Sequence, residues 1–214
     1  KTISTSRNNF YRDAPSGRLS LAYMMRRIFD YLALTKPLII ALLLMTTLSA
    51  MFVANGGMPS LDLILWTMLG GFLSAGGASA VNQYIDRDLD SEMSRTANRP
   101  IPSGRIQPAH ALIFGLTLSL LSVIVYGVFV NWLAALLSVI GWVYYVVFYT
   151  MYLKRATPQN IVIGGAAGAV PPLVGWAAAS GEINIPAFFL FAIIFYWTPP
   201  HFWSLALHRC EDYA

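Results

Sequence analysis

The sequence has 214 residues, of which 57% are hydrophobic and only 11% are charged, and its mean hydropathy is +0.58. Soluble domains carry about 25% charged residues, so the composition excludes an ordinary soluble domain and predicts a membrane protein. The single cysteine, Cys210, excludes a disulfide framework and a cysteine-rich metal site. The net charge of +4 comes without a basic stripe interleaved with aromatic residues, so we expect no nucleic-acid binding.

Six apolar stretches are long enough to cross a bilayer as helices, which takes about 20 residues each. We therefore predict an all-α, polytopic membrane helical bundle. Glycines in the second and fifth stretches, at 70–71, 76–77, 164–165 and 168, predict close contact between helices. The predicted spans are 37–54, 61–81, 108–129, 131–153, 160–180 and 185–207.

The basic residues all fall on one side of the membrane if six helices alternate. The loops 55–60, 130–131 and 181–184 contain none of the 14 Lys and Arg residues. Cytoplasmic loops carry the excess of Lys and Arg, so we predict that both ends face the cytoplasm of a bacterial inner membrane, or the matrix in a mitochondrion. We expect residues 1–30 to form a cytoplasmic arm and residues 31–214 to form the membrane domain.

Three acids follow the second span, in Asn82-Gln-Tyr-Ile-Asp86-Arg-Asp88-Leu-Asp90. A carboxylate costs about 2.5–3.5 kcal/mol at the centre of a membrane helix, so acids near membrane depth favour a functional role. Asn82, Asp86 and Asp90 recur every four residues and share one helix face, whereas Asp88 should point away. Magnesium takes one or two protein carboxylates and completes its shell with water and phosphate oxygens. The patch therefore predicts a diphosphate substrate that is bound through a metal ion.

The loop after these acids supplies positive charge. Arg95 and Arg99 are four residues apart, so one helical turn could aim both guanidiniums at the acids before Pro100 breaks the helix. Two interpretations stay open: solvated ion pairs worth about 0–1 kcal/mol each, or a cradle that binds metal and diphosphate together. The chain has no G-x-x-x-x-G-K-[ST] loop for nucleotide phosphates, so we expect the diphosphate to be a leaving group.

A departing diphosphate leaves an electron-poor carbon fragment behind. An allylic chain would form a stabilised cation, and aromatic rings could shield it from water and stabilise it by cation–π contact. Most aromatic residues here are expected to be ordinary core or interfacial residues. Those near the ends of spans four and six are Trp142, Tyr144, Tyr145, Phe148, Tyr149, Tyr152, Phe195, Tyr196, Trp197, Phe202 and Trp203.

These motifs resemble a known family. The sequence N-Q-Y-I-D-R-D-L-D, with the later R-T-A-N-R-P-I-P-S-G-R, resembles the first aspartate-rich motif of the UbiA-type intramembrane prenyltransferases. Three further segments resemble the haem-prenylating branch of that family, the protohaem IX farnesyltransferases or haem O synthases: Asp30–Pro37, Tyr149–Pro172 and Trp197–Trp203. The resemblance implies an all-helical enzyme of about nine spans around a central cavity, so we expect this chain to be part of a longer protein.

The resemblance also implies the chemistry. A farnesyl group would pass from farnesyl diphosphate to a vinyl group of haem b, giving haem O for terminal oxidases. Water would capture the resulting cation and leave a hydroxyethylfarnesyl group. Besides the lipid bilayer, the candidate partners are haem A synthase and cytochrome oxidase assembly components.

Site roles follow from the resemblance residue by residue. Asp86 and Asp90 would bind Mg2+, with Asn82 supporting them. The second acidic motif of the superfamily would begin at Glu211, and there Asp212 is the better candidate for a metal ligand. The basic residues near the diphosphate would be Lys36, Arg95, Arg99, Lys154 and Arg155.

Three histidines could ligate the haem iron. A histidine in a membrane helix is more often a hydrogen-bonded structural residue. His201 follows Pro199 and Pro200 on a helix that proline should kink, and it is the strongest of the three candidates. His110 begins a span and is expected at the interface, and His208 lies near the end of the chain.

Three other functions stay open. A related UbiA-type enzyme acting on a quinone or chlorophyll precursor would keep the cradle and change the acceptor. A transporter would use the acids as a cation relay, but it should spread them through several spans, whereas these charges gather at one face. An assembly subunit of a respiratory complex would have lost catalysis, which the intact set of Asn82, Asp86 and Asp90 disfavours.

Overall fold

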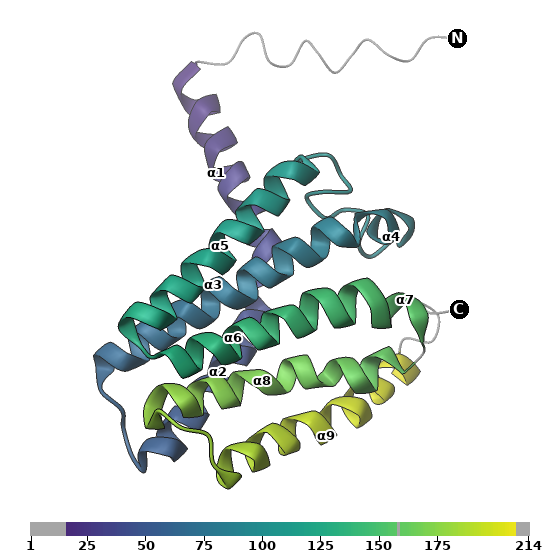
Figure 1. The fold of residues 1–214 in the computed structure, drawn as a ribbon. Helices are drawn as coiled ribbons and strands as arrows, with labels where there is room; N and C mark the ends of the chain where they lie inside the picture. The colour runs from purple at the N-terminus through teal and green to yellow at the C-terminus, as the bar shows by residue number, and fades with distance from the viewer. Residues whose placement is uncertain (1–15, 158, 209–214) are drawn as a thin grey trace, which may run out of the picture.

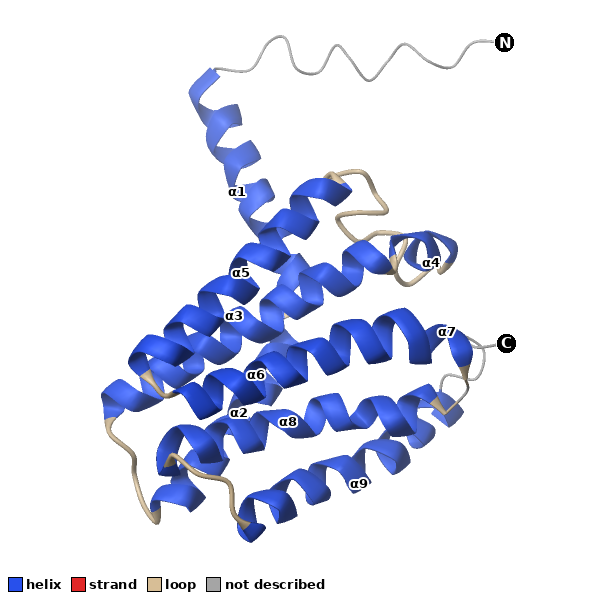
Figure 2. Ribbon diagram, in the orientation of Figure 1, coloured by secondary structure: helices blue, strands red, loops and turns tan. Residues whose placement is uncertain are grey.

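A computed structural model of the chain describes residues 16–157 and 159–208, and within them it is helical, with no strand (Figures 1 and 2). Six helical segments in this part are long and apolar enough to cross a membrane, and each begins within one residue of a predicted span. They are α2 (Pro37–Asn55), α3 (Leu61–Ile85), α5 (Pro108–Phe129), α6 (Trp132–Val143) continued by the π-helical segment η1 (Tyr144–Leu153), α8 (Asn160–Ser180) and α9 (Ile185–His208).

Three further helices complete the described part: α1 (Ser16–Thr35), α4 (Arg87–Glu92) and α7 (Lys154–Ala156). Helix α1 projects away from the bundle, toward the start of the chain (Figure 1). It runs through residue 30 without interruption. The division into an arm and a membrane domain at that residue stays a prediction.

Small residues bring the helices close together. Helix α3 packs along α5, α2 along α8, and α8 along α6 and α9. A Cβ atom on Gly77 of α3 would lie 2.7 Å from the carbonyl oxygen of Gly115 in α5, so these helices need glycine where they meet. A Cβ atom on Gly175 would likewise overlap the carbonyl of Thr47. The prediction of close contact is confirmed at Gly77 and wrong at Gly168, where an added Cβ would meet nothing within 4 Å.

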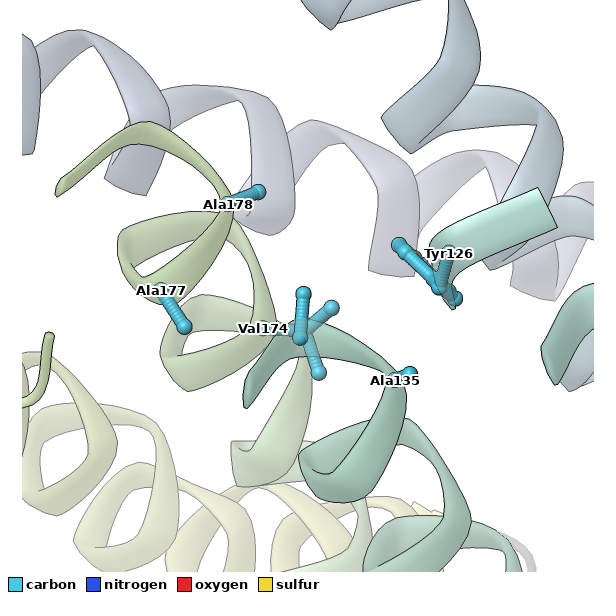
Figure 3. Packing of buried hydrophobic residues seen from close by; sticks show 6 residues of the cluster. Tyr126, Ala135, Val174, Ala177 and Ala178 are labelled. Carbon is cyan, nitrogen blue, oxygen red and sulfur yellow. The ribbon is translucent and has the colours of Figure 1, made fainter. Parts of the chain in front are cut away.

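An apolar cluster joins α5, α6 and α8 (Figure 3). The hydroxyl of its buried Tyr126 donates a hydrogen bond of 3.1 Å to the carbonyl of Thr67. Asn131, in the turn between α5 and α6, accepts from the N–H of Ala134 and donates to the carbonyl of Ala177, both at 2.8 Å. It thus caps one helix and ties it to another. The buried cluster consists of Tyr126, Ala134, Ala135, Val174, Ala177 and Ala178.

The two ends of the bundle differ in charge. Helices α4 and α7 and the end of α9 lie at one end, and the turns at 55–60, 130–131 and 181–184 lie at the other (Figure 1). None of those three turns contains Lys or Arg. The asymmetry of basic residues is therefore a property of the folded bundle. Which end faces the cytoplasm stays a prediction.

Candidate functional site

The acidic motif lies where α3 ends and α4 begins. Asp86 forms a turn between them (φ −85°, ψ 5°), yet its N–H bonds the carbonyl of Asn82 at 2.9 Å and the N–H of Asp90 bonds the carbonyl of Asp86 at 2.8 Å. The helical register therefore continues through the turn. The side chains of Asn82, Asp86 and Asp90 are buried and that of Asp88 is exposed, as the four-residue spacing predicts.

Asn82 links three parts of the chain. Its amide nitrogen Nδ2 donates to Asp86 Oδ2 at 2.8 Å and to the hydroxyl oxygen of Thr150, in η1, at 3.1 Å. Its amide oxygen Oδ1 accepts from Lys36 Nζ at 3.1 Å. This one side chain thus connects the start of α2, the end of α3 and η1.

Asp86 carries one satisfied and one open carboxylate oxygen. Its Oδ2 accepts from Asn82 and from Lys154 Nζ, which lies 2.7 Å away. Its Oδ1 is buried and has no hydrogen-bond partner among the described residues. A buried carboxylate oxygen without a donor is unfavourable unless a ligand completes its coordination. Asp86 is therefore arranged to accept a ligand at Oδ1.

Asp90 is paired with an arginine from the following loop. Arg99 Nη1 lies 2.8 Å from Oδ1 and 2.7 Å from Oδ2 of this carboxylate. The hydroxyl of Thr96 donates to the backbone carbonyl of Asp90 at 2.8 Å and holds the loop against α4. The spacing of Arg95 predicts that it also faces the acids. In the structure Arg95 is exposed, and among the described residues it makes no ion pair with Asp86 or Asp90.

Lys36 lies between α1 and α2 in the left-handed backbone region (φ 55°, ψ 63°). That conformation costs a residue other than glycine about 1–2 kcal/mol. Gln83, which is buried beside Asn82, holds the junction by donating to the carbonyl of Leu34 at 2.8 Å. Burial, followed by the nearby Arg99 guanidinium, lowers the pKa of Lys36 to about 8.

Five charged side chains act on one another at this site. The pKa of Lys36 responds to four other charges, so these residues occupy one electrostatic neighbourhood although they come from four separate segments. Sequence reasoning missed the two uncharged residues that hold them, Gln83 and Thr150. The available signal was a second amide next to Asn82 and a hydroxyl four residues before Lys154. The charged residues are Lys36, Asp86, Asp90, Arg99 and Lys154.

The remaining candidates lie away from this centre or outside the described residues. His201 is exposed on α9, where its ring stacks on Trp197 with 4.8 Å between centroids. His110 is exposed near the start of α5. Arg155 lies in α7, but the structure does not describe its side chain or that of His208. Glu211 and Asp212 lie outside the described residues.

The carboxylate oxygens of Asp86 and Asp90 fit a hard cation that takes its remaining ligands from a substrate and water. No group of three His, Cys, Asp or Glu side chains in the described residues could hold a metal ion by itself. Magnesium needs only one or two protein carboxylates and takes phosphate and water oxygens for the rest. Asp86 and Asp90 supply that number, and Asp86 Oδ1 has no competing donor among the described residues.

Fold and site together define a polytopic membrane protein with a buried centre of carboxylates and cations at one end of a helical bundle. The sequence profile described as the UbiA prenyltransferase family matches residues 43–214. The chain belongs to this family.

Several curated relatives of this chain are named protoheme IX farnesyltransferase. The protoheme IX farnesyltransferase of Chloroflexus aurantiacus is 58% identical over 87% of this chain and 32% of its own length. Those of Roseiflexus sp. and Streptomyces coelicolor are 53% and 51% identical, over 86% and 88% of this chain and over 35% and 60% of their own lengths. The chain therefore spans about a third to three fifths of the length of these relatives.

Two solved structures share the fold. That of digeranylgeranylglyceryl phosphate synthase has a TM-score of 0.70 and covers 79% of this chain and 59% of its own. That of a UbiA homologue from Archaeoglobus fulgidus, bound to DMAPP and Mg2+, has a TM-score of 0.56 and covers 79% and 60%. Both are 20% identical to this chain, so the likeness shows the fold alone.

Proposed function

We propose that this chain forms the diphosphate-binding part of an enzyme that transfers a farnesyl group from farnesyl diphosphate to a vinyl group of haem b, giving haem O. Relatives named for this activity are 51–58% identical over most of the chain. The observation that carries the site assignment is Asp86, a buried carboxylate with one oxygen bonded to Lys154 and Asn82 and the other open.

The proposed metal is Mg2+, held by Asp86 and Asp90, with Asp212 as a further proposed ligand. When bound, it would supply positive charge to the departing diphosphate. The Archaeoglobus homologue with DMAPP and Mg2+ supports this choice. Arg99 occupies both oxygens of Asp90. Each oxygen keeps a second lone pair, so Asp90 can bind a cation while Arg99 stays in contact with it.

The cations of the site neutralise the leaving group. As the bond between the farnesyl C1 and the diphosphate oxygen breaks, its electron pair leaves with the diphosphate, where Lys36, Arg99 and Lys154 stabilise the growing negative charge. Each already neighbours an acid or Asn82, so little reorganisation is needed when the charge develops. Arg95 and Arg155 are proposed as outer cations that attract the diphosphate to the site.

The acceptor half of the reaction uses the haem vinyl group. Its π electrons form a bond to the farnesyl C1, and water adds to the resulting cation and loses a proton. Tyr145 and Tyr149 stack at 5.7 Å between centroids on η1 and are candidates to shield the farnesyl cation. His201 is the proposed ligand of the haem iron, because its exposed ring lies on α9 among large aromatic residues.

The proposed setting is a bacterial inner membrane or the mitochondrial inner membrane, with the charged end of the bundle facing the cytoplasm or matrix. Basic residues gather at that end, as they do on cytoplasmic loops. Haem A synthase or an assembly component of cytochrome oxidase would then receive the product.

Acceptor competition tests this proposal. Membranes that contain the protein are incubated with labelled farnesyl diphosphate, haem b and 4-hydroxybenzoate, with and without Mg2+. We expect label in the haem fraction only, and only with the metal present. Label in 4-hydroxybenzoate would favour a quinone-type prenyltransferase. Label in neither acceptor, in membranes where the protein is correctly inserted, would contradict a prenyl-transfer function.

A further inference from the structure

The π-helical segment η1 places a fully buried hydroxyl, that of Thr150, against the acidic motif. Thr150 donates to the carbonyl of Tyr145, five residues earlier, at 2.9 Å. Threonines in α-helices bond the carbonyl three or four residues earlier, as Thr47 does to Leu43 in α2. π-Helical segments are rare in proteins, and those that occur often lie at functional sites. In η1 the altered helical geometry directs the Thr150 hydroxyl to the carbonyl five residues earlier.

The direction of this bond determines what Thr150 can do for α3. A hydroxyl has one proton, and here it is given to Tyr145. Toward Asn82 the oxygen can therefore only accept, and it does so from Nδ2 at 3.1 Å. Asn82 must present its NH2 group to Thr150, and the second proton of that group goes to Asp86 Oδ2 at 2.8 Å.

The orientation of the Asn82 amide determines which of its atoms face Lys36 and Asp86. With Nδ2 held by Thr150 and Asp86, the oxygen Oδ1 faces the ammonium of Lys36. The flipped amide would set Oδ1 against a carboxylate and NH2 against an ammonium, and both contacts are repulsive. Asp86 and Lys36 thus already favour this orientation, and Thr150, whose oxygen can only accept from Nδ2, holds the amide in place between them.

We propose that Thr150 is a positioning residue for the diphosphate site: through Asn82 it holds Lys36 and Asp86 in the arrangement that binds metal and diphosphate. The inference rests on the proposed function and extends it to a residue that touches neither ligand. The alternative is a plain packing contact between α3 and η1, which would affect folding and leave ligand binding unchanged.

Two substitutions separate these roles. Thr150→Val keeps the shape and removes the hydroxyl, and Thr150→Ser keeps the hydroxyl. Thr67→Val is the matched control, because Thr67 is equally buried on α3 and its hydroxyl has no hydrogen-bond partner among the described residues. Each variant is assayed in membranes for the KM of farnesyl diphosphate, for kcat and for the Mg2+ concentration at half-maximal rate. Thermal shift with Mg2+ and inorganic pyrophosphate measures binding without turnover.

Thr150→Val should raise the KM and the half-maximal Mg2+ concentration about tenfold, the size of effect that groups supporting a metal ligand have. Thr150→Ser should stay within about twofold of the wild type, and so should Thr67→Val. A Thr150→Val variant that melts earlier but keeps its KM, its Mg2+ dependence and its pyrophosphate-induced shift overturns the positioning role, as does a Ser variant that is equally impaired. A wild type that binds neither ligand overturns the proposed function as well.

Discussion

The two ends of the bundle are held together in different ways. At the turn between α5 and α6, Asn131 bonds the nearby Ala134 and one neighbouring helix, and the surrounding cluster is mostly alanine. At the charged end, buried polar side chains bond partners distant in sequence: Lys36 to Asn82, and Asp86 to Lys154. The first arrangement is what a stable helical bundle needs. The second leaves a carboxylate oxygen open, which favours a ligand site.

The two ends divide the work of stabilising the fold and of binding a ligand. Apolar and capped contacts at the end whose turns carry no Lys or Arg fix the helices, so the end that holds the acidic motif can tolerate unfavourable features. These features include a left-handed Lys36, an open oxygen on Asp86 and a lowered pKa of Lys36. Strained backbone and unsatisfied groups persist where the surrounding structure imposes them, and they gather at functional sites.

The strongest test removes a carboxylate. Asp86→Ala and Asp90→Ala should each lower haem O formation by at least about 100-fold, since each removes charge that is needed to hold the metal and diphosphate. Asp62→Ala is the control, because Asp62 is an exposed acid at the other end of the same helix α3. Labelled product is measured in membranes with matched protein levels. Wild-type product in either site variant would remove these acids from the proposed cradle.

The lowered pKa of Lys36 predicts opposite effects of pH on stability and on activity. Its folded-state pKa is about 8, against an ordinary value of 10.5, so between these values the unfolded chain binds more protons and stability rises with pH. Activity should change in the opposite direction, because deprotonation removes a cation from the diphosphate site. The value of kcat/KM for farnesyl diphosphate reports the free enzyme, and it should fall above about pH 8. Lys36→Arg should keep its charge and show no such fall.

Arg95 and Arg99 together test whether an arginine must contact the acids in order to support diphosphate binding. Arg99→Ala should raise the KM for farnesyl diphosphate about tenfold, because it removes the cation that contacts Asp90. Arg95→Ala should change the KM by less than about twofold, since its exposed charge is screened by solvent and salt. Initial rates at low and high salt check both values. Equal losses in the two variants would place Arg95 in the cradle with Arg99.

Changes near Asn131, at the end opposite the acidic motif, should affect stability alone. Asn131→Ala removes the cap of α6 and the bond to Ala177, and it should cost about 1 kcal/mol of stability. The melting temperature in detergent should therefore fall, while the KM for farnesyl diphosphate in membranes stays unchanged. A raised KM in this variant would show that the two ends are coupled.

The helical spans were predictable because hydropathy and length are local properties of the chain. A shared face for Asn82, Asp86 and Asp90 also follows from helical spacing, and the structure continues α3 beyond the predicted span of 61–81 to Ile85. The sequence could not separate Arg95 from Arg99. Both lie in one loop at helical spacing, and only the path of the turn brings Arg99 to Asp90.

Composition and helical spacing were enough to predict a polytopic helical membrane protein with an acidic motif at one end, because the bilayer requires long apolar helices and allows few buried charges. The family resemblance pointed to Lys36 and Lys154, and only the packing of the helices shows what they contact and brings in Thr150. Lys36, Thr150 and Lys154 come from segments 46 to 68 residues away along the chain. Contacts over such distances depend on how the helices pack, which no local pattern in the sequence specifies.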